Sequence, residues 1–178
     1  GIRTPMVMRW PGVSGAGTNG SALAYRLRNT DLPMKELVRR EHALLLENAL
    51  LDTEQPVGLA IPEGLRARGE PGSYVVQARG ALDDGFGARL RAVGAVVVSY
   101  IPNQAYLVRA SAAAAAALRA DAGVQVVVAY EPYYKLKGSL LGAAVRGEAL
   151  PDDGVLNVML FADAAAATKA ELARLGAA

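Results

Sequence analysis

The chain has 178 residues, a hydrophobic fraction of 52%, 19 Lys plus Arg against 17 Asp plus Glu, and a formal net charge of +2. This length suits one ordinary domain or two small ones, and the apolar fraction is enough to bury a core. The chain has no Cys and one His, which excludes disulfides, thiolate chemistry and any metal site built from several His ligands.

The charge pattern argues against nucleic acid as a partner, because the small net charge is spread along the chain and Lys and Arg alternate with acids. No apolar run reaches the roughly 18 residues that a membrane-spanning helix requires. The composition therefore predicts neither nucleic-acid binding nor a membrane span.

The first zone, residues 1–72, is predicted to be an N-terminal extension. Apolar residues recur at helical spacing from Met34 to Leu50, with charged residues between them, which predicts a helix over about 33–51. The segment 52–72 contains three Pro and four Gly, a composition typical of an irregular tether.

The second zone, residues 73–134, alternates strand and helix signals. Asp83 and Ser111 stand where helix caps are expected, and Gly94 stands where the first helix should end. The order βαββαβ is that of the ferredoxin-like split βαβ motif, an α+β module with both helices on one face of an antiparallel four-stranded sheet. The strand signals lie at 74–79, 95–101, 104–109 and 124–130.

The last zone, residues 155–178, repeats the opening of the second at a constant offset of 82 residues, so that Val76 matches Val158 and Gly94 matches Gly176. It is predicted to be the first half (βα) of a second similar module, joined by a linker over 135–154. A half module lacks partners for its apolar faces, so we expect the chain to be a fragment of a longer protein or to be completed by another chain.

Roughly residues 45–140 resemble a known family of modules. The resemblance rests on three segments, Gly72–Gly80, Val98–Arg109 and Val127–Leu136. In order and in their Tyr-Ile-Pro-Asn turn they resemble the prodomain-type modules that precede the catalytic domain of some large secreted bacterial subtilisin-like serine proteases. The resemblance implies a propeptide-like ferredoxin fold, a secreted or cell-surface location, and a role as intramolecular chaperone and inhibitor. It also implies a partner, the cognate subtilisin-like catalytic domain of the same precursor.

The chain itself is predicted to be non-catalytic. A serine protease needs Asp, His and a nucleophilic Ser in one geometry, but no nucleophile turn surrounds any Ser and the sole His42 is expected at the surface of the predicted helix. Residues 15–20 match G-x-G-x-x-G without the flanking strand and acid of a dinucleotide site. We therefore expect no cofactor and no metal site.

A tyrosine-rich segment at the exit of the module is the candidate partner-binding site, because aromatic side chains beside a basic residue often anchor interfaces. Two alternatives remain open: the tyrosines cover the open end of their own sheet, or the stretch 130–141 forms a contact between modules. The candidate residues are Tyr130, Glu131, Pro132, Tyr133, Tyr134 and Lys135.

Two functions from different classes follow. In the first, an exposed sheet face of a prodomain-like module binds the protease domain, assists its folding and blocks its cleft. In the second, the chain is a structural or adhesive module of an extracellular assembly, completed by strand pairing. The predicted open edge of 156–161 would then pair with the extended segment 6–10 of the same chain or of a neighbouring copy.

Overall fold

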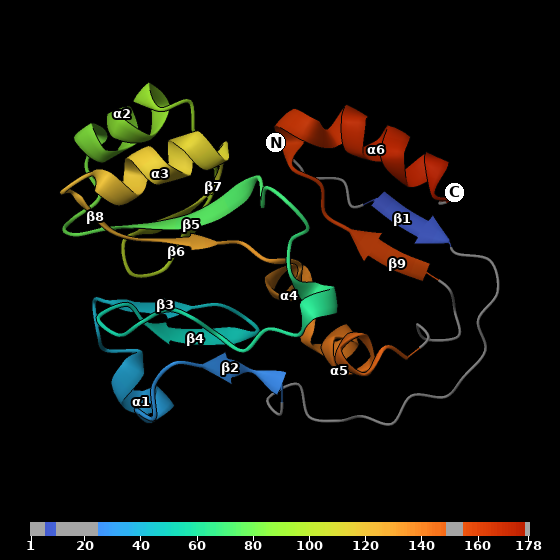
Figure 1. Cartoon of the computed structure of the whole chain (residues 1–178), viewed down its shortest axis with the longest axis horizontal. Coiled ribbons are helices and arrows are strands. Elements are labelled where there is room, and N and C mark those ends of the chain that lie inside the picture. The colour runs from blue at the N-terminus through green and yellow to red at the C-terminus, as the bar shows by residue number, and fades with distance from the viewer. Residues whose placement is uncertain (1–5, 10–24, 149–154, 177–178) are drawn as a thin grey trace. The chain divides into compact units, whose positions relative to one another are not determined.

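The computed structural model describes residues 6–9, 25–148 and 155–176, which belong to two compact units. One unit comprises Gly1–Asn19 and Arg146–Ala178, and the other comprises Gly20–Val145. Helices and strands are mixed in the chain, which confirms the α+β class (Figure 1).

The larger unit contains a four-stranded sheet in the order β6-β7-β5-β8, in which every neighbouring pair is antiparallel. Helix α2 connects β5 to β6, and helix α3 connects β7 to β8. The bounds are β5 Ser73–Ala78, α2 Asp84–Ala92, β6 Val96–Ile101, β7 Ala105–Arg109, α3 Ala112–Ala120 and β8 Val124–Ala129.

The ends of these helices form as their side chains predict. The Asp83 carboxylate accepts a hydrogen bond from the Phe86 N–H at 2.7 Å, and the Ser111 hydroxyl accepts one from the Ala114 N–H at 3.1 Å. Both satisfy backbone donors that a first helical turn leaves unpaired. Gly94 follows α2 with a φ of 77°, the left-handed conformation expected of a residue that ends a helix.

Alternation along β5 divides its side chains between two buried faces. Tyr74, Val76 and Ala78 pack in one core with Phe86 of α2 and Leu118 of α3. Strand residues two apart share a face, so Ser73, Val75 and Gln77 lie on the opposite one. All six β5 side chains are buried, and the sheet is therefore covered on both sides at its centre.

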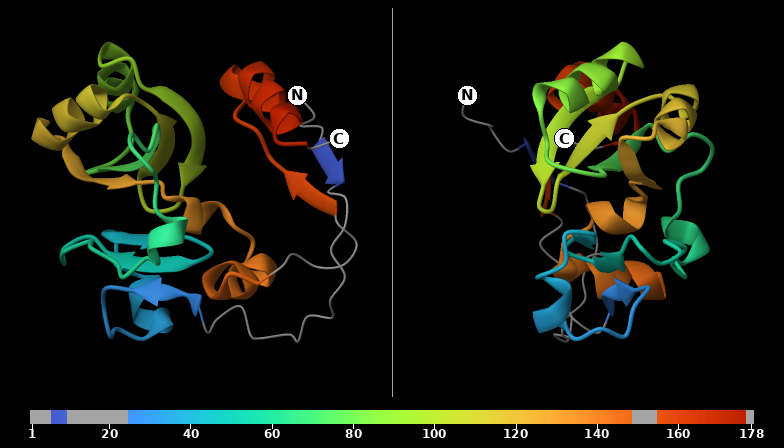
Figure 2. Two further views of the ribbon diagram at one scale, coloured as in Figure 1. Left: turned by 45° about the vertical axis from the view of Figure 1, so that its right-hand side comes forward. Right: turned by 90° about the vertical axis from the view of Figure 1, so that its left-hand side faces the viewer.

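The cover on the second face is the N-terminal segment, which forms a sheet in the order β2-β4-β3. Figures 1 and 2 show α2 and α3 on one side of the four-stranded sheet and β3 and β4 on the other. The sequence-based expectation of an exposed sheet face is wrong at β5, because the protein's own N-terminal sheet covers it. The bounds are β2 Leu27–Arg28, α1 Met34–Leu37, β3 Ala43–Leu45 and β4 Ala49–Asp52.

The predicted helix over 33–51 is also wrong. Only α1 is helical there, and the Leu-rich remainder folds into the β3–β4 hairpin, in which the Leu46 N–H donates to the Ala49 carbonyl at 2.9 Å. Successive apolar residues satisfy a helical spacing, but they suit equally a pair of strands buried on both faces. Leu44, Leu51 and Ala49 are fully buried, and Asn103 of the β6–β7 turn donates to the Ala43 carbonyl at 2.8 Å, so contact with the four-stranded sheet favours strands here.

Segments predicted as connections differ from one another in structure. Residues 53–72 contain a single 3-10 turn, η2 (Glu63–Leu65), and no other regular element. The predicted linker over 135–154 instead carries a nine-residue helix, α5 (Gly138–Arg146), directly after the short helix α4 (Pro132–Lys135). Leu141 of α5 is fully buried, which gives this segment a packing role that its position between modules did not suggest.

In the smaller unit, β1 (Met6–Arg9) pairs antiparallel with β9 (Val155–Val158), with Met8 opposite Leu156. The predicted pairing of the N-terminal segment with this edge therefore occurs within one chain. The 3-10 turn η3 (Ala162–Ala164) and helix α6 (Ala165–Arg174) follow, and Gly176 has a φ of 83°, matching Gly94. No side chain of residues 156–176 is fully buried. No helix in the described part of the chain is long and apolar enough to cross a membrane.

Candidate functional site

The candidate site, residues 130–135, is called the tyrosine tail below. It continues directly from β8, since the Tyr130 N–H donates to the Ser73 carbonyl at 2.9 Å and so extends the pairing with β5. Pro132 then starts α4 at the first helical position, where its missing N–H and fixed φ are tolerated. Pairing with β5 thus fixes where the three tyrosines of the tail lie in the larger unit.

Two of the three tyrosines in the tail are buried. Tyr133 is 1% exposed and Tyr134 is 6% exposed. The Tyr133 hydroxyl donates to the Tyr25 carbonyl, and the Tyr130 hydroxyl donates to the Tyr134 carbonyl at 3.2 Å. The rings of Tyr133 and Tyr134 meet edge to face with centroids 6.1 Å apart, a favourable aromatic geometry.

The loop of the β3–β4 hairpin holds the tail from the other side. Asn48, only 1% exposed, donates from its amide nitrogen to the Tyr133 carbonyl at 3.1 Å and to the Leu136 carbonyl at 2.5 Å. These are carbonyls at the end of α4, where a helix lacks internal donors. Glu47 accepts from the Gly138 N–H at 2.9 Å and from the Lys137 ammonium at 3.1 Å. The loop therefore caps α4 at its end and α5 at its start.

Electrostatics at the tail follow from this burial. Burial raises the pKa of Tyr134 to about 12, with the nearby Glu131 carboxylate adding to the effect. Burial also raises the pKa of Tyr130 and lowers the pKa of Lys135. The hydrogen bond from the Gly138 N–H, followed by that from Lys137, lowers the pKa of Glu47. All four shifts have structural causes and describe a packed contact.

The six predicted partner-binding residues therefore serve mainly the fold of their own chain. Tyr133 and Tyr134 are buried, Tyr130, Glu131 and Pro132 are half-buried, and only Lys135 is exposed. Glu131 accepts a hydrogen bond from the Ala67 N–H at 2.6 Å and thereby ties the tail to the segment 53–72. This arrangement fits the alternative in which the tyrosines cover their own protein.

Sequence reasoning missed Glu47 and Asn48, the two residues that complete this contact. They interrupt a run of seven apolar residues, with four before Glu47 and three after Asn48. An Asn at that position is a turn signal, which could have divided the predicted helix into two strands. Their partners lie 85 to 91 residues further along the chain, so the contact itself has no local signature.

The sole histidine lies beside a small cluster of charged side chains in the larger unit. His42 lies in the turn before β3 with its side chain 34% exposed, as expected of a surface position, and its Nε2 is 3.8 Å from a Glu54 carboxylate oxygen. Arg40 bridges Glu54 at 3.4 Å and Asp52 at 3.5 Å. The His42 imidazole therefore lies beside an acid, while the Thr53 hydroxyl donates to the backbone carbonyl of His42 at 2.8 Å.

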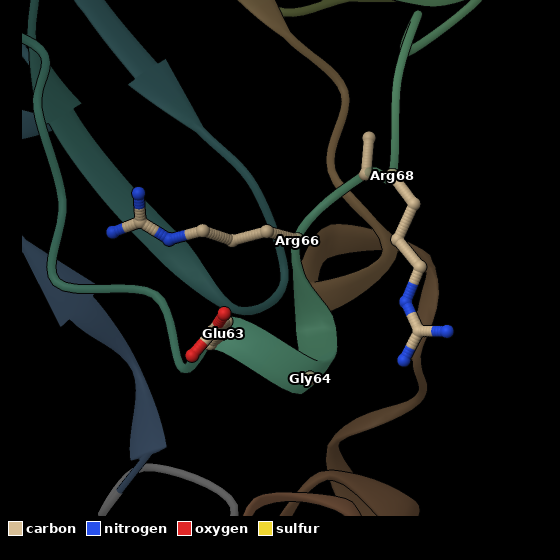
Figure 3. A pocket seen from close by; sticks show the side chains of 5 residues that line it. Glu63, Gly64, Arg66 and Arg68 are labelled. Atoms are coloured by element: carbon tan, nitrogen blue, oxygen red, sulfur yellow. The ribbon is translucent and has the colours of Figure 1, made fainter.

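A surface hollow of about 410 Å³ lies at η2, lined by Glu63, Gly64, Arg66, Ala67 and Arg68. Figure 3 shows the Arg66 and Arg68 side chains pointing away from one another. The Arg66 guanidinium is already bonded to the Ile61 carbonyl at 2.9 Å. Ligand sites require polar groups that converge, and this hollow offers none. Within the described ranges, no group of three His, Asp or Glu side chains is arranged to hold a metal ion. The glycine motif at 15–20 lies outside the described residues.

Comparison with known proteins places the chain in a family. Residues 28–131, more than half of the chain, match the model of a family described as Domain of unknown function (DUF8729). The match runs from β2 through β8, so it includes both the N-terminal sheet and the four-stranded sheet with its helices. No curated protein and no solved structure matches the chain. The chain therefore belongs to the DUF8729 family, and the matched residues lie within the larger compact unit.

Proposed function

We propose that this member of the DUF8729 family is a non-catalytic protein-binding module of prodomain type. In this proposal it assists the folding of a subtilisin-like catalytic domain of the same secreted bacterial precursor and inhibits it. The observation that carries the proposal is the order of the four-stranded sheet. Numbered 1 to 4 in chain order, its strands run 4-1-3-2 with antiparallel neighbours, an order that supports the proposal of a ferredoxin-like split βαβ module.

Two further observations support a binding role over an enzymatic one. Three polar side chains of the larger unit cap helices or join its two sheets, namely Glu47, Asn48 and Gln77. The family match covers β2 to β8 as one domain, which is the size of an independent module. A fold is compatible with many functions, so the protease partner rests on the sequence resemblance and needs a direct test.

The test is a refolding assay with the catalytic domain of the same precursor, denatured and diluted into buffer with or without this full chain. We expect a higher yield of active protease at low ratios of chain to enzyme and slower peptide hydrolysis when the chain is in excess. An unrelated protein of the same size, added at the same concentration, controls for non-specific protection of unfolded protein. The proposal fails if neither yield nor hydrolysis differs from this control.

The second candidate function is a structural module of an extracellular assembly. The smaller unit contains a two-stranded ribbon and a helix, and no side chain among residues 156–176 is fully buried. Such a ribbon is marginal alone, and sheets usually need three or more strands. Since β1 occupies one edge of β9, removing residues 1–12 should free that edge and increase self-association. Sedimentation at several concentrations, with and without residues 1–12, tests this; an unchanged mass distribution would count against assembly through the 156–161 edge.

A further inference from the structure

The outer edge of β6 differs from the opposite edge of the same four-stranded sheet, which is β8. β6 stands at the end of the four-stranded sheet and pairs only with β7. Its sequence, Val-Val-Val-Ser-Tyr-Ile, contains no charge, Gly or Pro, and no charged residue lies between Arg91 and Arg109. Natural proteins usually blunt an edge strand with charges or Pro to prevent pairing with another chain. β6 lacks these devices.

β6 also carries exposed apolar surface. Val96 is 47% exposed, Val97 is 44% exposed and Tyr100 is 58% exposed. Val97 and Tyr100 lie opposite Val108 and Tyr106, on the side of the sheet that carries the helices. The Tyr100 ring meets the Tyr106 ring edge to face at 6.1 Å, so it is held in place at the surface.

The opposite edge of the same sheet provides an internal comparison. β8 has no fully exposed side chain, and its Gln125 donates to the Thr53 carbonyl at 3.4 Å, which ties this edge to the N-terminal sheet. Its end continues into the tyrosine tail. The side chains of β8 are therefore at least half-buried within the chain, whereas β6 at the other edge is apolar and exposed, which favours a partner at β6.

The charges of α2 indicate which partner fits. This helix contacts β6, carries Asp84 in its first turn and carries Arg91 in its last turn, while Arg89 of that turn pairs with Asp121 of the same chain at 3.8 Å. A helix that connects two strands across one intervening strand runs antiparallel to both. If a second copy adds its β6 antiparallel to the first, the two α2 helices lie on the same face and run in opposite directions. The acidic end of each helix then faces the basic end of the other.

We propose that the β6 edge is a homodimerisation site, at which two copies of this chain pair β6 with β6 antiparallel to form one continuous eight-stranded sheet. The interface is isologous, as two-fold symmetry requires. Val97 and Tyr100 of both copies cover one another, and Asp84 of each copy faces Arg91 of the other. A bulge between Val97 and Ser99 divides the pairing strand into two short segments. The site does not depend on the proposed protease partner or on β1 and β9.

The experiment measures the mass of the full chain by sedimentation equilibrium from about 1 to about 100 µM, a range that resolves dimers of ordinary affinity. We expect a monomer–dimer equilibrium that the Val97→Lys substitution weakens by about tenfold or more, because two ammonium groups then meet at the interface. The matched control is Val38→Lys, since Val38 is also 44% exposed but lies at the end of α1. This variant should dimerise as the wild type does.

A charge swap tests the orientation. Asp84→Lys and Arg91→Asp should each weaken the dimer, and the double variant should recover most of the loss, because each helix end then meets its complement again. Circular dichroism on every variant checks that the fold is kept, and Tyr100→Lys provides a second edge variant if Val97→Lys unfolds. A wild type that stays monomeric overturns the proposal. A dimer that is insensitive to both edge substitutions overturns it as well.

Discussion

Gln77 provides the sharpest test of how the two sheets are joined. It lies on the central strand β5 and is fully buried. Its side-chain nitrogen donates to the Glu41 carbonyl at 3.1 Å and to the Asn103 carbonyl at 2.8 Å. Carbonyls only accept hydrogen bonds, so these two contacts fix the orientation of the amide and turn its oxygen toward the Thr53 hydroxyl at 2.7 Å. One side chain thus connects the four-stranded sheet, the N-terminal sheet and the β6–β7 turn.

The perturbation is Gln77→Met, which keeps the length of the side chain and removes all three hydrogen bonds. Each bond contributes about 0.5–1.5 kcal/mol net, and the two carbonyls lose a partner in a buried place, so we expect the free energy of unfolding to fall by about 2–4 kcal/mol. The similar volume of Met keeps the packing contribution small. Thr53→Val removes one of the three hydrogen-bond partners of Gln77 and should lower the free energy of unfolding by about 1 kcal/mol.

The assay is chemical denaturation followed by circular dichroism, with Gln55→Met as the matched control at an exposed position. That control should stay within about 0.5 kcal/mol of the wild type. The double variant Thr53→Val, Gln77→Met should lose less than the sum of the single variants, because both remove the same hydrogen bond. A loss below about 0.5 kcal/mol for Gln77→Met would refute the reasoning, since a buried amide with three partners cannot be neutral.

Three other predictions follow from caps, glycines and titration. Glu47→Gln should lower stability near neutral pH by less than about 1 kcal/mol, since the carboxylate is partly exposed. The hydrogen bond from Gly138 lowers the pKa of Glu47 below 4.5, so the contribution of Glu47 to stability is present above pH 4.5 and is lost as pH falls through the lowered pKa. Denaturation from pH 7 to pH 3 should therefore show a smaller loss of stability in acid for the variant than for the wild type. Gly94→Ala should destabilise by about 1 kcal/mol in urea because its φ is 77°, whereas Gly80→Ala, without a positive φ, should not. Burial of Tyr134 raises its pKa from 10.0 to about 12, so its contribution to stability is complete below pH 10 and disappears as pH rises through 12. Absorbance at alkaline pH should show one tyrosine that ionises late, together with unfolding. Ionisation of all tyrosines near pH 10 in the folded state would contradict this.

The sequence predicted best what local signals determine. The elements from β5 to β8 have their own strand-forming residues, and Asp83, Ser111 and Gly94 mark the helix ends, so order and bounds could be read from 73–134. The repeat at offset 82 led to the expectation of a βα pair at 155–178, and β9 and α6 lie there.

What failed depended on distant partners. Residues 43–52 became strands because a sheet formed by residues 73–129 covers them, and no pattern within the segment reports that cover. The sequence offers two interpretations of the tyrosine tail, a partner-binding site and a cover for the open end of its own sheet, and local signals do not distinguish them. The burial of the tail depends on Asn48 and Tyr25, which lie 85 and 108 residues away from Tyr133. Side chains chosen for such contacts look like ordinary loop residues in the sequence.

The hydrogen bonds that Glu47 and Asn48 make to the end of α4 and the start of α5 also constrain how the chain folds during synthesis. The β3–β4 hairpin leaves the ribosome early, but the carbonyls and the amide that its loop binds belong to residues 133–138. Contacts this far apart in sequence form slowly because a long loop must close first. Until the four-stranded sheet of residues 73–129 has been synthesised, the hairpin has no layer to cover its leucines, and the nascent N-terminal segment exposes an aggregation-prone surface. The larger unit is therefore expected to fold late and in one step, after translation has passed α4.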